Sequence, residues 1–349
     1  MKKLLNTLYV TTAEAYISKE GGNVVISLNG NELFRIPIIN LESIVTFGYQ
    51  GASPGVMQMC AKNGVNLSFF TPQGRFVSRV QGPINGNILL RRTQFRLLDN
   101  DAEKQRLASR FILGKLYNSR IILRRFLRDY PQDAAHDAME RSSNLLKQLF
   151  LKTQQPLPLD LLRGIEGEGA AIYFEAFRNL IKNPDSAFKF SGRTRRPPTD
   201  PVIALLSLGY SMLANDCASA LEGVGLDPAA GIMHSLRPGR NSLALDLMEE
   251  MRGYIVDRFV ISLINNRQIS PSDFKIHSDI DSEVTTSVVF TDNGLKKFLT
   301  AWQNRKKTEF NHPFLNEKIK IGLLPHVQAM LLARNLRGDI DDYPVFLLK

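Results

Sequence analysis

The sequence predicts a protein of two domains: a small β-rich, β-sandwich-like domain over residues 1–85, a linker over 86–92, and a large all-α domain over 93–349. A length of 349 residues exceeds what a single hydrophobic core usually organises. The first part alternates short β-branched and aromatic runs with glycine and asparagine turns. Beyond residue 92, apolar residues recur at three-to-four spacing, which is the period of helices.

In the N-terminal part, Asn29-Gly30 between two apolar runs predicts a tight hairpin, and Pro72-Gln73-Gly74 predicts a second one. Met1-Lys2-Lys3 imitates a signal peptide, but the following residues are too polar for its apolar region. We therefore expect a first strand there. The predicted strands are 8–10, 24–28, 33–37, 43–47, 65–70 and 76–80, with one short helix over 54–63.

In the C-terminal part, the apolar spacing predicts a series of helices, which we place at 93–130, 143–153, 164–182, 200–221, 228–236, 242–266, 292–306 and 316–336. Gly82, Pro83 and Gly86 lie near the change of period and mark the linker. No uninterrupted apolar run approaches the roughly 18 residues of a membrane span, so no membrane partner is expected.

The net charge of +10 makes a polyanion the first partner to consider. Residues 91–130 hold eleven basic side chains against four acidic ones. Either a solvated helix surface or a nucleic-acid-binding face accounts for this excess. The only two cysteines, Cys60 and Cys217, are far apart in sequence and exclude a disulfide framework or a zinc ribbon. We expect a cytoplasmic protein.

Three segments place charged side chains where the apolar period predicts a core. In the first, helical spacing puts Glu166 on one stripe with Ala170, Tyr173 and Phe177, whereas Glu168 falls on a solvated face. An inward carboxylate must be hydrogen-bonded, ion-paired or bound to a metal. Residue types alone leave these three accounts of Glu166 open.

The second segment carries His234 at the end of the helix predicted over 228–236, just before a Pro-Gly turn. Asp227-Pro228 is typical of a helix N-terminus. A satisfied core histidine and a metal ligand are both compatible with this position. Two arginines, Arg237 and Arg240, flank the turn.

The third segment places Asp246, Glu249, Glu250 and Asp257 on one stripe of the helix predicted over 242–266, with no cation between them. Either a solvated face or a bound cation would relieve their repulsion. Carboxylates with one imidazole suit Mg²⁺ or Mn²⁺, and such an ion can activate an attack on a phosphodiester. The residues alone thus indicate a metal-dependent enzyme acting on nucleic acid.

These segments, together with Arg-Arg-Pro-Pro-Thr-Asp-Pro over 195–201, resemble the CRISPR-associated adaptation integrase family, the universal spacer-acquisition nucleases. The combination of Gly-Ile-Glu-Gly over 164–167, His234 before Arg-Pro-Gly-Arg, and Ser-Leu-Ala-Leu-Asp-Leu-Met-Glu-Glu over 242–250 carries the resemblance across nearly the whole chain. One departure is Ile203, where the family commonly has asparagine.

The resemblance implies a catalytic set of Glu166, His234, Glu249 and Asp246, of which Glu166, His234 and Glu249 would hold Mn²⁺ or Mg²⁺. It also implies an integrase and endonuclease that joins protospacer 3′-hydroxyl ends to the CRISPR repeat by transesterification. Its expected partners are DNA, a second copy bound through the β-rich domain, and a small ferredoxin-like adaptation protein. The expected DNA-positioning residues are Arg195, Arg196, Arg237 and Arg240.

Two other functions are compatible with the sequence. In a non-catalytic nucleic-acid scaffold, the acidic residues would only solvate a helix. In a repair nuclease outside CRISPR, the same metal chemistry would serve another substrate. Both remain alternatives at this point.

Overall fold

The computed structural model describes residues 6–12, 14–82, 88–190, 192, 198–277 and 287–348, which divide into two compact units. The first unit comprises Met1–Asn85, Ser272–Lys275 and Val289–Lys307, and the second comprises Gly86–Pro271, Ile276–Val288 and Thr308–Lys349. The first unit therefore combines the N-terminal β-rich segment with helix α9 (Asp292–Lys307), which is distant in sequence.

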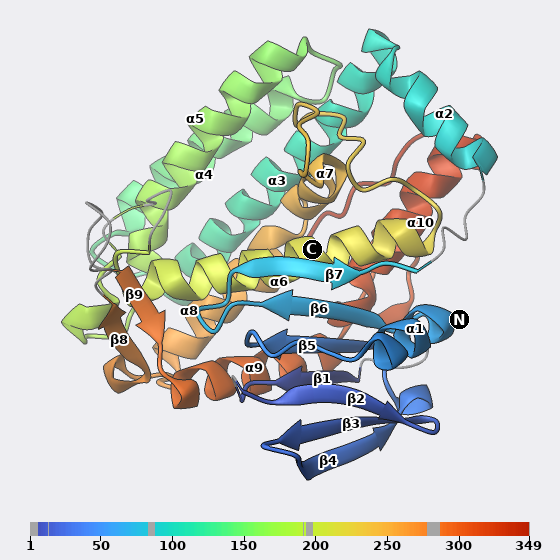
Figure 1. The fold of residues 1–349 in the computed structure, drawn as a ribbon. Coiled ribbons are helices and arrows are strands. Elements are labelled where there is room, and N and C mark those ends of the chain that lie inside the picture. Colours follow the sequence, from blue (N-terminus) through green and yellow to red (C-terminus); the bar gives the residue numbers. More distant parts are fainter. Residues whose placement is uncertain are drawn as a thin grey trace. The chain divides into compact units, whose positions relative to one another are not determined.

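The β-rich unit contains a three-stranded antiparallel sheet and a four-stranded mixed sheet (Figure 1). The first sheet has the order β2-β3-β4 and the second β1-β5-β6-β7, in which β1, β5 and β6 run parallel. The strands are β1 (Thr7–Val10), β2 (Tyr16–Glu20), β3 (Asn23–Leu28), β4 (Asn31–Pro37), β5 (Ser43–Phe47), β6 (Asn66–Phe70) and β7 (Phe76–Val80). The sequence patterns missed β2.

Both predicted hairpins form. Asn29 and Gly30 join β3 to β4 with φ angles of 50° and 81°, the left-handed pair that a two-residue hairpin requires. Helix α1 (Pro54–Asn63) connects β5 to β6, and Ser53 accepts a hydrogen bond from the Val56 amide at its start. One hydrophobic core draws on both sheets and α1, with fully buried Ile17, Val24, Ile44, Val56 and Leu67.

The second unit is built on long helices, and α3, α4 and α5 pack against one another (Figure 1). Its helices are α2 (Ile88–Leu98), α3 (Asp101–Asp129), α4 (His136–Lys152), α5 (Leu159–Phe177), α6 (Pro201–Gly223), α7 (Ser242–Glu249), a π-helical turn (Gly253–Asp257), α8 (Arg258–Asn265) and α10 (Leu324–Arg337). A β-rich N-terminal region and a largely helical remainder are thus confirmed.

Several details of the prediction are wrong, among them the length of one helix and the absence of strands. The helix predicted over 93–130 is broken, because the Asn100 side chain accepts hydrogen bonds from the Ala102 and Glu103 amides and starts a new helix there. The C-terminal part is not all-α, since β8 (Phe274–His277) pairs with β9 (Ser287–Phe290) and β10 (Glu309–Asn311) pairs with β11 (Lys318–Lys320). These strands are only three or four residues long, too short for a periodic pattern.

Helix α6 is the most apolar long helix of the described residues, and by length and composition it could cross a membrane. Inside the fold, 67% of its most apolar window is buried. It begins where the Asp200 carboxylate accepts a hydrogen bond from the Ile203 amide at 2.8 Å, with Pro201 in the first turn. Ile203 itself is buried, so α6 is a core helix of the second unit.

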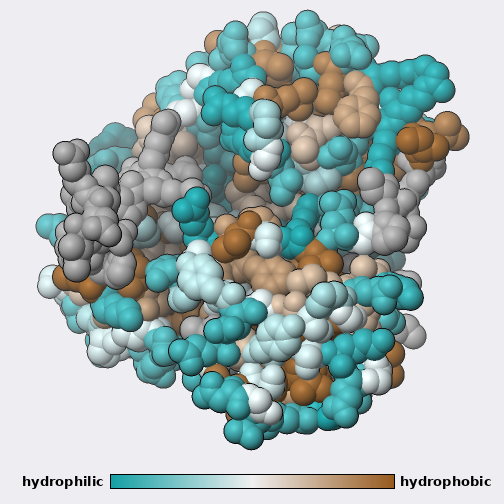
Figure 2. Space-filling model, in the orientation of Figure 1, coloured by the Kyte–Doolittle hydropathy of each residue, from teal (hydrophilic) through white to brown (hydrophobic). Residues whose placement is uncertain are grey.

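Hydrophilic side chains cover much of the face drawn in Figure 2, and a small hydrophobic patch lies over α2. The exposed apolar residues of this helix are Ile88, Leu89 and Phe95. On its other side, the Gln94 side chain bonds both the amide and the carbonyl of Asp227. The start of the 226–241 loop is thereby fixed to α2.

Candidate active site

Two carboxylates predicted as metal ligands meet at one ammonium group in the second unit. Lys115 on α3 lies 2.7 Å from Glu249 Oε2 on α7, and its Nζ also contacts Glu166 Oε1 on α5. The side chains of Lys115 and Glu249 are only 7% and 6% exposed, whereas that of Glu166 is 26% exposed. Residues distant in sequence thus form one compact charged cluster that opens to solvent at Glu166.

Glu249 remains ionised in this cluster although it is buried. Burial on its own would raise the pKa of Glu249, but the nearby Lys115 and Arg252 outweigh it and bring the pKa down to about 2. The guanidinium of Arg252 lies 3.3 Å from Glu249 Oε2. His234 makes a smaller contribution to the lowered pKa of Glu249.

A close approach of two helices brings Glu166 to Lys115. A Cβ atom at Gly169 would lie 2.1 Å from Leu116 Cδ2, so any larger residue there would force the Leu116 side chain to shift where α5 packs on α3. Gly169 is one turn after Glu166, and Leu116 follows Lys115 directly. Gly167, in contrast, faces open space, and Glu168 is exposed as expected.

His234 is held by the buried Asp246 carboxylate. His234 Nδ1 lies 2.5 Å from Asp246 Oδ1, and the same carboxylate accepts hydrogen bonds from the amides of Ile232, Met233 and His234 at 2.6–3.0 Å. With Nδ1 directed at a carboxylate, Nε2 is left to act on a ligand. Asp246 therefore orients His234, and it does not join the cluster at Lys115.

The helix predicted over 228–236 is absent, because hydrogen bonds to the Asp246 carboxylate replace the bonds within such a helix. Three successive amides that would serve a helix point instead at one carboxylate from the following helix. The Asp227 side chain accepts a hydrogen bond from the Ala229 amide in a local turn. From the other side, Arg163, three residues before Glu166, donates to the Met233 carbonyl at 3.1 Å.

The predicted acidic stripe over 246–257 does not form one face. Glu250 is buried against the C-terminal segment, where it accepts hydrogen bonds from Gln328, Tyr343 and the Phe346 amide. Burial raises the pKa of Glu250 to about 7, against the effect of these bonds.

Asp257 does not share a helical face with Glu249, because the π-helical turn at 253–257 has more residues per turn than the α-helix α7. Its Oδ1 accepts a hydrogen bond from the Tyr210 hydroxyl at 2.5 Å. Arg252, with its guanidinium 4.2 Å from the centre of the Tyr210 ring, lies within the segment between Glu249 and Asp257. The expectation of four carboxylates without a cation between them was therefore wrong.

The donor set at this site suits a divalent ion once the ammonium is replaced. In the present arrangement, no group of three His, Cys, Asp or Glu side chains among the described residues could hold a metal ion. The two glutamates that meet here, Glu166 and Glu249, are bridged by the Lys115 ammonium. Two carboxylates converging on one cation, with an imidazole nearby, are ligands that Mg²⁺ and Mn²⁺ accept.

The expected DNA-positioning arginines are only partly described. Arg237 and Arg240 flank a turn with Gly239 at φ 71°, and neither has an acidic partner among the described residues. Arg195 and Arg196 lie outside the described residues. On α3, Arg120 and Arg124 are also without acidic partners in the described part of the chain, and burial together with Arg124 lowers the pKa of Arg120.

Sequence reasoning missed Lys115 as a member of the site and counted it only among the basic residues of 91–130. Its spacing carried a usable indication, since Phe111, Lys115 and Ile122 fall on one helical face and both hydrophobic neighbours are buried. A lysine on an apolar stripe must find a buried partner. The sequence positions of Arg163 and Arg252 carried no similar signal that these arginines belong to the site.

Comparison with known proteins places the chain in a family. Residues 8–304 match the family model described as CRISPR associated protein Cas1. The chain is 48% identical to "CRISPR-associated endonuclease Cas1 1" of Chlorobaculum tepidum, over 99% of both chains. It is 46% identical to "CRISPR-associated endonuclease Cas1 2" of Rhodospirillum rubrum, over the full length of both.

Solved structures share the fold at lower identity. A casposase bound to an integration product superposes with a TM-score of 0.81 at 22% identity, covering 98% of this chain and 94% of that one. A Cas6-RT-Cas1–Cas2 complex gives a TM-score of 0.81 at 21% identity, covering 99% of this chain and 36% of that one. The matches in sequence, over nearly the whole length, show that this chain belongs to the Cas1 family of CRISPR-associated proteins.

Proposed function

We propose that this chain is a divalent-metal-dependent DNA integrase and endonuclease of CRISPR spacer acquisition, acting in the cytoplasm. The observation that carries the proposal is the convergence of Glu166 and Glu249 on one cation beside a histidine fixed by Asp246. Curated relatives named as Cas1 endonucleases and a casposase bound to an integration product support this class of reaction.

In the proposed reaction, the oxygen of a protospacer 3′-hydroxyl forms a bond to a phosphorus atom of the repeat. The bond from that phosphorus to its former 3′ oxygen breaks, so one phosphodiester replaces another. With water in place of the hydroxyl, the same site cleaves DNA. Arg237 and Arg240, which have no acidic partner among the described residues, would hold phosphates of the bound strand, together with Arg195 and Arg196.

The glutamates, the histidine and the residues that hold them each have a task in this proposal. Glu166, Glu249 and His234 would hold Mn²⁺ or Mg²⁺, and a bound ion supplies charge neutralisation at the phosphate oxygens during attack. Asp246 keeps Nδ1 of His234 engaged, so that Nε2 would be the ring nitrogen left to bind the ion. Arg252, behind Glu249, keeps that carboxylate ionised.

We also propose that the chain works as a dimer with a small ferredoxin-like adaptation protein. The β-rich unit exposes Leu33 and Phe34 on β4, which suits a protein partner. A solved complex that contains both Cas1 and Cas2 shares this fold, which supports the second partner.

The matched pair Glu166→Gln and Glu168→Gln tests the proposed function. Both residues lie on α5, but Glu166 faces the cluster and Glu168 is exposed. With Mn²⁺, we expect Glu166→Gln to slow joining of a 3′-hydroxyl strand to repeat DNA by at least about tenfold, since an amide retains an oxygen but not the charge. Glu168→Gln should match the unchanged protein.

DNA binding by fluorescence anisotropy, without metal, should stay the same in both variants. Unchanged joining by Glu166→Gln would contradict the proposal and favour a non-catalytic scaffold. Cleavage of branched DNA without any joining to a repeat would favour a repair nuclease outside CRISPR.

A further inference from the structure

Lys115 has no task in the proposed reaction, yet its ammonium lies at the centre of the site. The group contacts both Glu166 and Glu249 and is almost fully enclosed. A divalent ion that binds the same two carboxylates cannot share this position with an ammonium, because both would occupy one space and repel each other. Metal binding therefore requires Lys115 to move.

We propose that Lys115 is an exchangeable internal cation: it neutralises the carboxylate pair in the metal-free protein and withdraws into an adjoining cavity when a divalent ion binds. This inference rests on the proposed metal site and adds a residue that sets its affinity. Without such a cation, two close carboxylates with little solvent around them would repel each other and disfavour the folded site.

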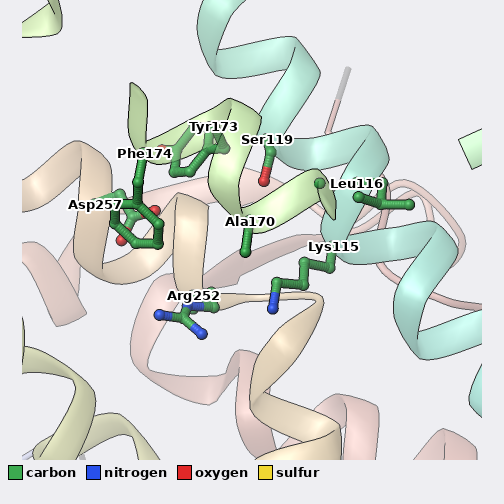
Figure 3. A pocket seen from close by; sticks show the side chains of 9 residues that line it. Lys115, Leu116, Ser119, Ala170, Tyr173, Phe174, Arg252 and Asp257 are labelled. Atoms are coloured by element: carbon green, nitrogen blue, oxygen red, sulfur yellow. The ribbon is translucent and has the colours of Figure 1, made fainter. Parts of the chain in front are cut away.

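The cavity beside Lys115 is of the right size for the displaced group. Its volume is about 10 Å³, and its lining includes Lys115, Ser119, Ala170, Arg252 and Asp257 (Figure 3). Such a volume holds about one water molecule, and an ammonium group is of similar size. The four-carbon stem of lysine rotates freely enough to change places over a short distance.

The chemistry of the lining also suits a cation. Asp257 carries a carboxylate and Ser119, one turn after Lys115 on α3, carries a hydroxyl that can accept a hydrogen bond. The positive charge of Arg252 would repel an ammonium in this cavity. This repulsion is reduced because Glu249 and Asp257 both interact electrostatically with Arg252. The withdrawn ammonium would thus exchange its two glutamate partners for the Asp257 carboxylate and the Ser119 hydroxyl.

A planar guanidinium cannot make this exchange. It is several times larger than an ammonium and would not enter a cavity for one water molecule. An arginine at position 115 would therefore keep its charge on the carboxylate pair, whereas a glutamine would remove the competing charge altogether. The two substitutions should change metal affinity in opposite directions.

The test is calorimetric titration of the metal-free full chain with Mn²⁺ alone. We expect Lys115→Gln to bind Mn²⁺ about tenfold more tightly than the unchanged protein, and Lys115→Arg about tenfold more weakly. The matched control is Lys182→Gln, which removes a lysine paired with Asp133 at 2.5 Å elsewhere in the same unit. Its affinity should not change.

Equal or weaker Mn²⁺ binding by Lys115→Gln would overturn the inference, as would equal or tighter binding by Lys115→Arg. If Lys115→Gln does not fold, as judged by circular dichroism, Lys115→Arg decides the matter, since it retains the charge. Glu166→Gln separates this inference from the proposed function. If that variant binds Mn²⁺ as well as the unchanged protein, the metal site is wrong, whereas a position-115 failure alone leaves the metal site intact.

Discussion

Replacing His234 with alanine is expected to lower the rate of strand joining by about 100-fold or more. Several contacts fix the position of His234. The Asp246 carboxylate binds its Nδ1 and accepts hydrogen bonds from three backbone amides of the same loop. Alanine leaves that loop in place, because the amide contacts to Asp246 do not involve the side chain. Chemistry should therefore fail while the fold and DNA binding persist.

A disintegration assay measures this most cleanly, with branched DNA as substrate, with and without Mn²⁺. The matched control is His136→Ala, which removes the partly exposed histidine at the start of α4. We expect the control to reseal the branch at the normal rate. If His234→Ala also reseals the branch at the normal rate, His234 has no role in the reaction.

Replacing Asp246 with asparagine is expected to destabilise the helical unit by about 3 kcal/mol. The carboxylate is fully buried and accepts bonds from four donors. An asparagine amide has one oxygen to accept with, and its NH₂ would face buried N–H groups that then lack a partner. Because the same group orients His234, joining should also fall by about tenfold or more.

Thermal unfolding followed by circular dichroism, without metal, checks the stability effect. The matched control is Asp99→Asn at the exposed end of α2, where we expect a change within about 0.5 kcal/mol. An Asp246→Asn variant with the stability of the control and full activity would show that the carboxylate does not hold the His234 loop.

Local sequence patterns correctly predicted those helices and turns whose first or last residues are typical boundary residues. Asp200-Pro201 starts α6 as expected, and helix α9 spans 292–307 against a prediction of 292–306. Asn29-Gly30 turns between β3 and β4, because its two residues tolerate positive φ. In each case the residues that set the boundary are adjacent in sequence.

The loop over 226–241 could not be predicted in the same way. Asp227-Pro228 is a good helix start in isolation, but the Asp246 carboxylate arrives from a later helix and takes the amides that a helix would need. A contact between residues twelve or more apart outweighed the local preference. Apolar periodicity placed Glu166 on an inward stripe and acidic periodicity drew attention to the segment that holds Glu249, but neither pattern could show that the two glutamates share Lys115.

The central claim is that Glu166, His234 and Glu249 hold one divalent ion in place of the Lys115 ammonium. A crystal of the full chain soaked in Mn²⁺, with anomalous difference density collected at the manganese edge, tests it directly. The account predicts one peak roughly 2.1 Å from donor atoms of all three residues, with Nζ of Lys115 moved toward Ser119 and Asp257. Absence of such a peak, with Lys115 still bridging the two glutamates, would contradict it.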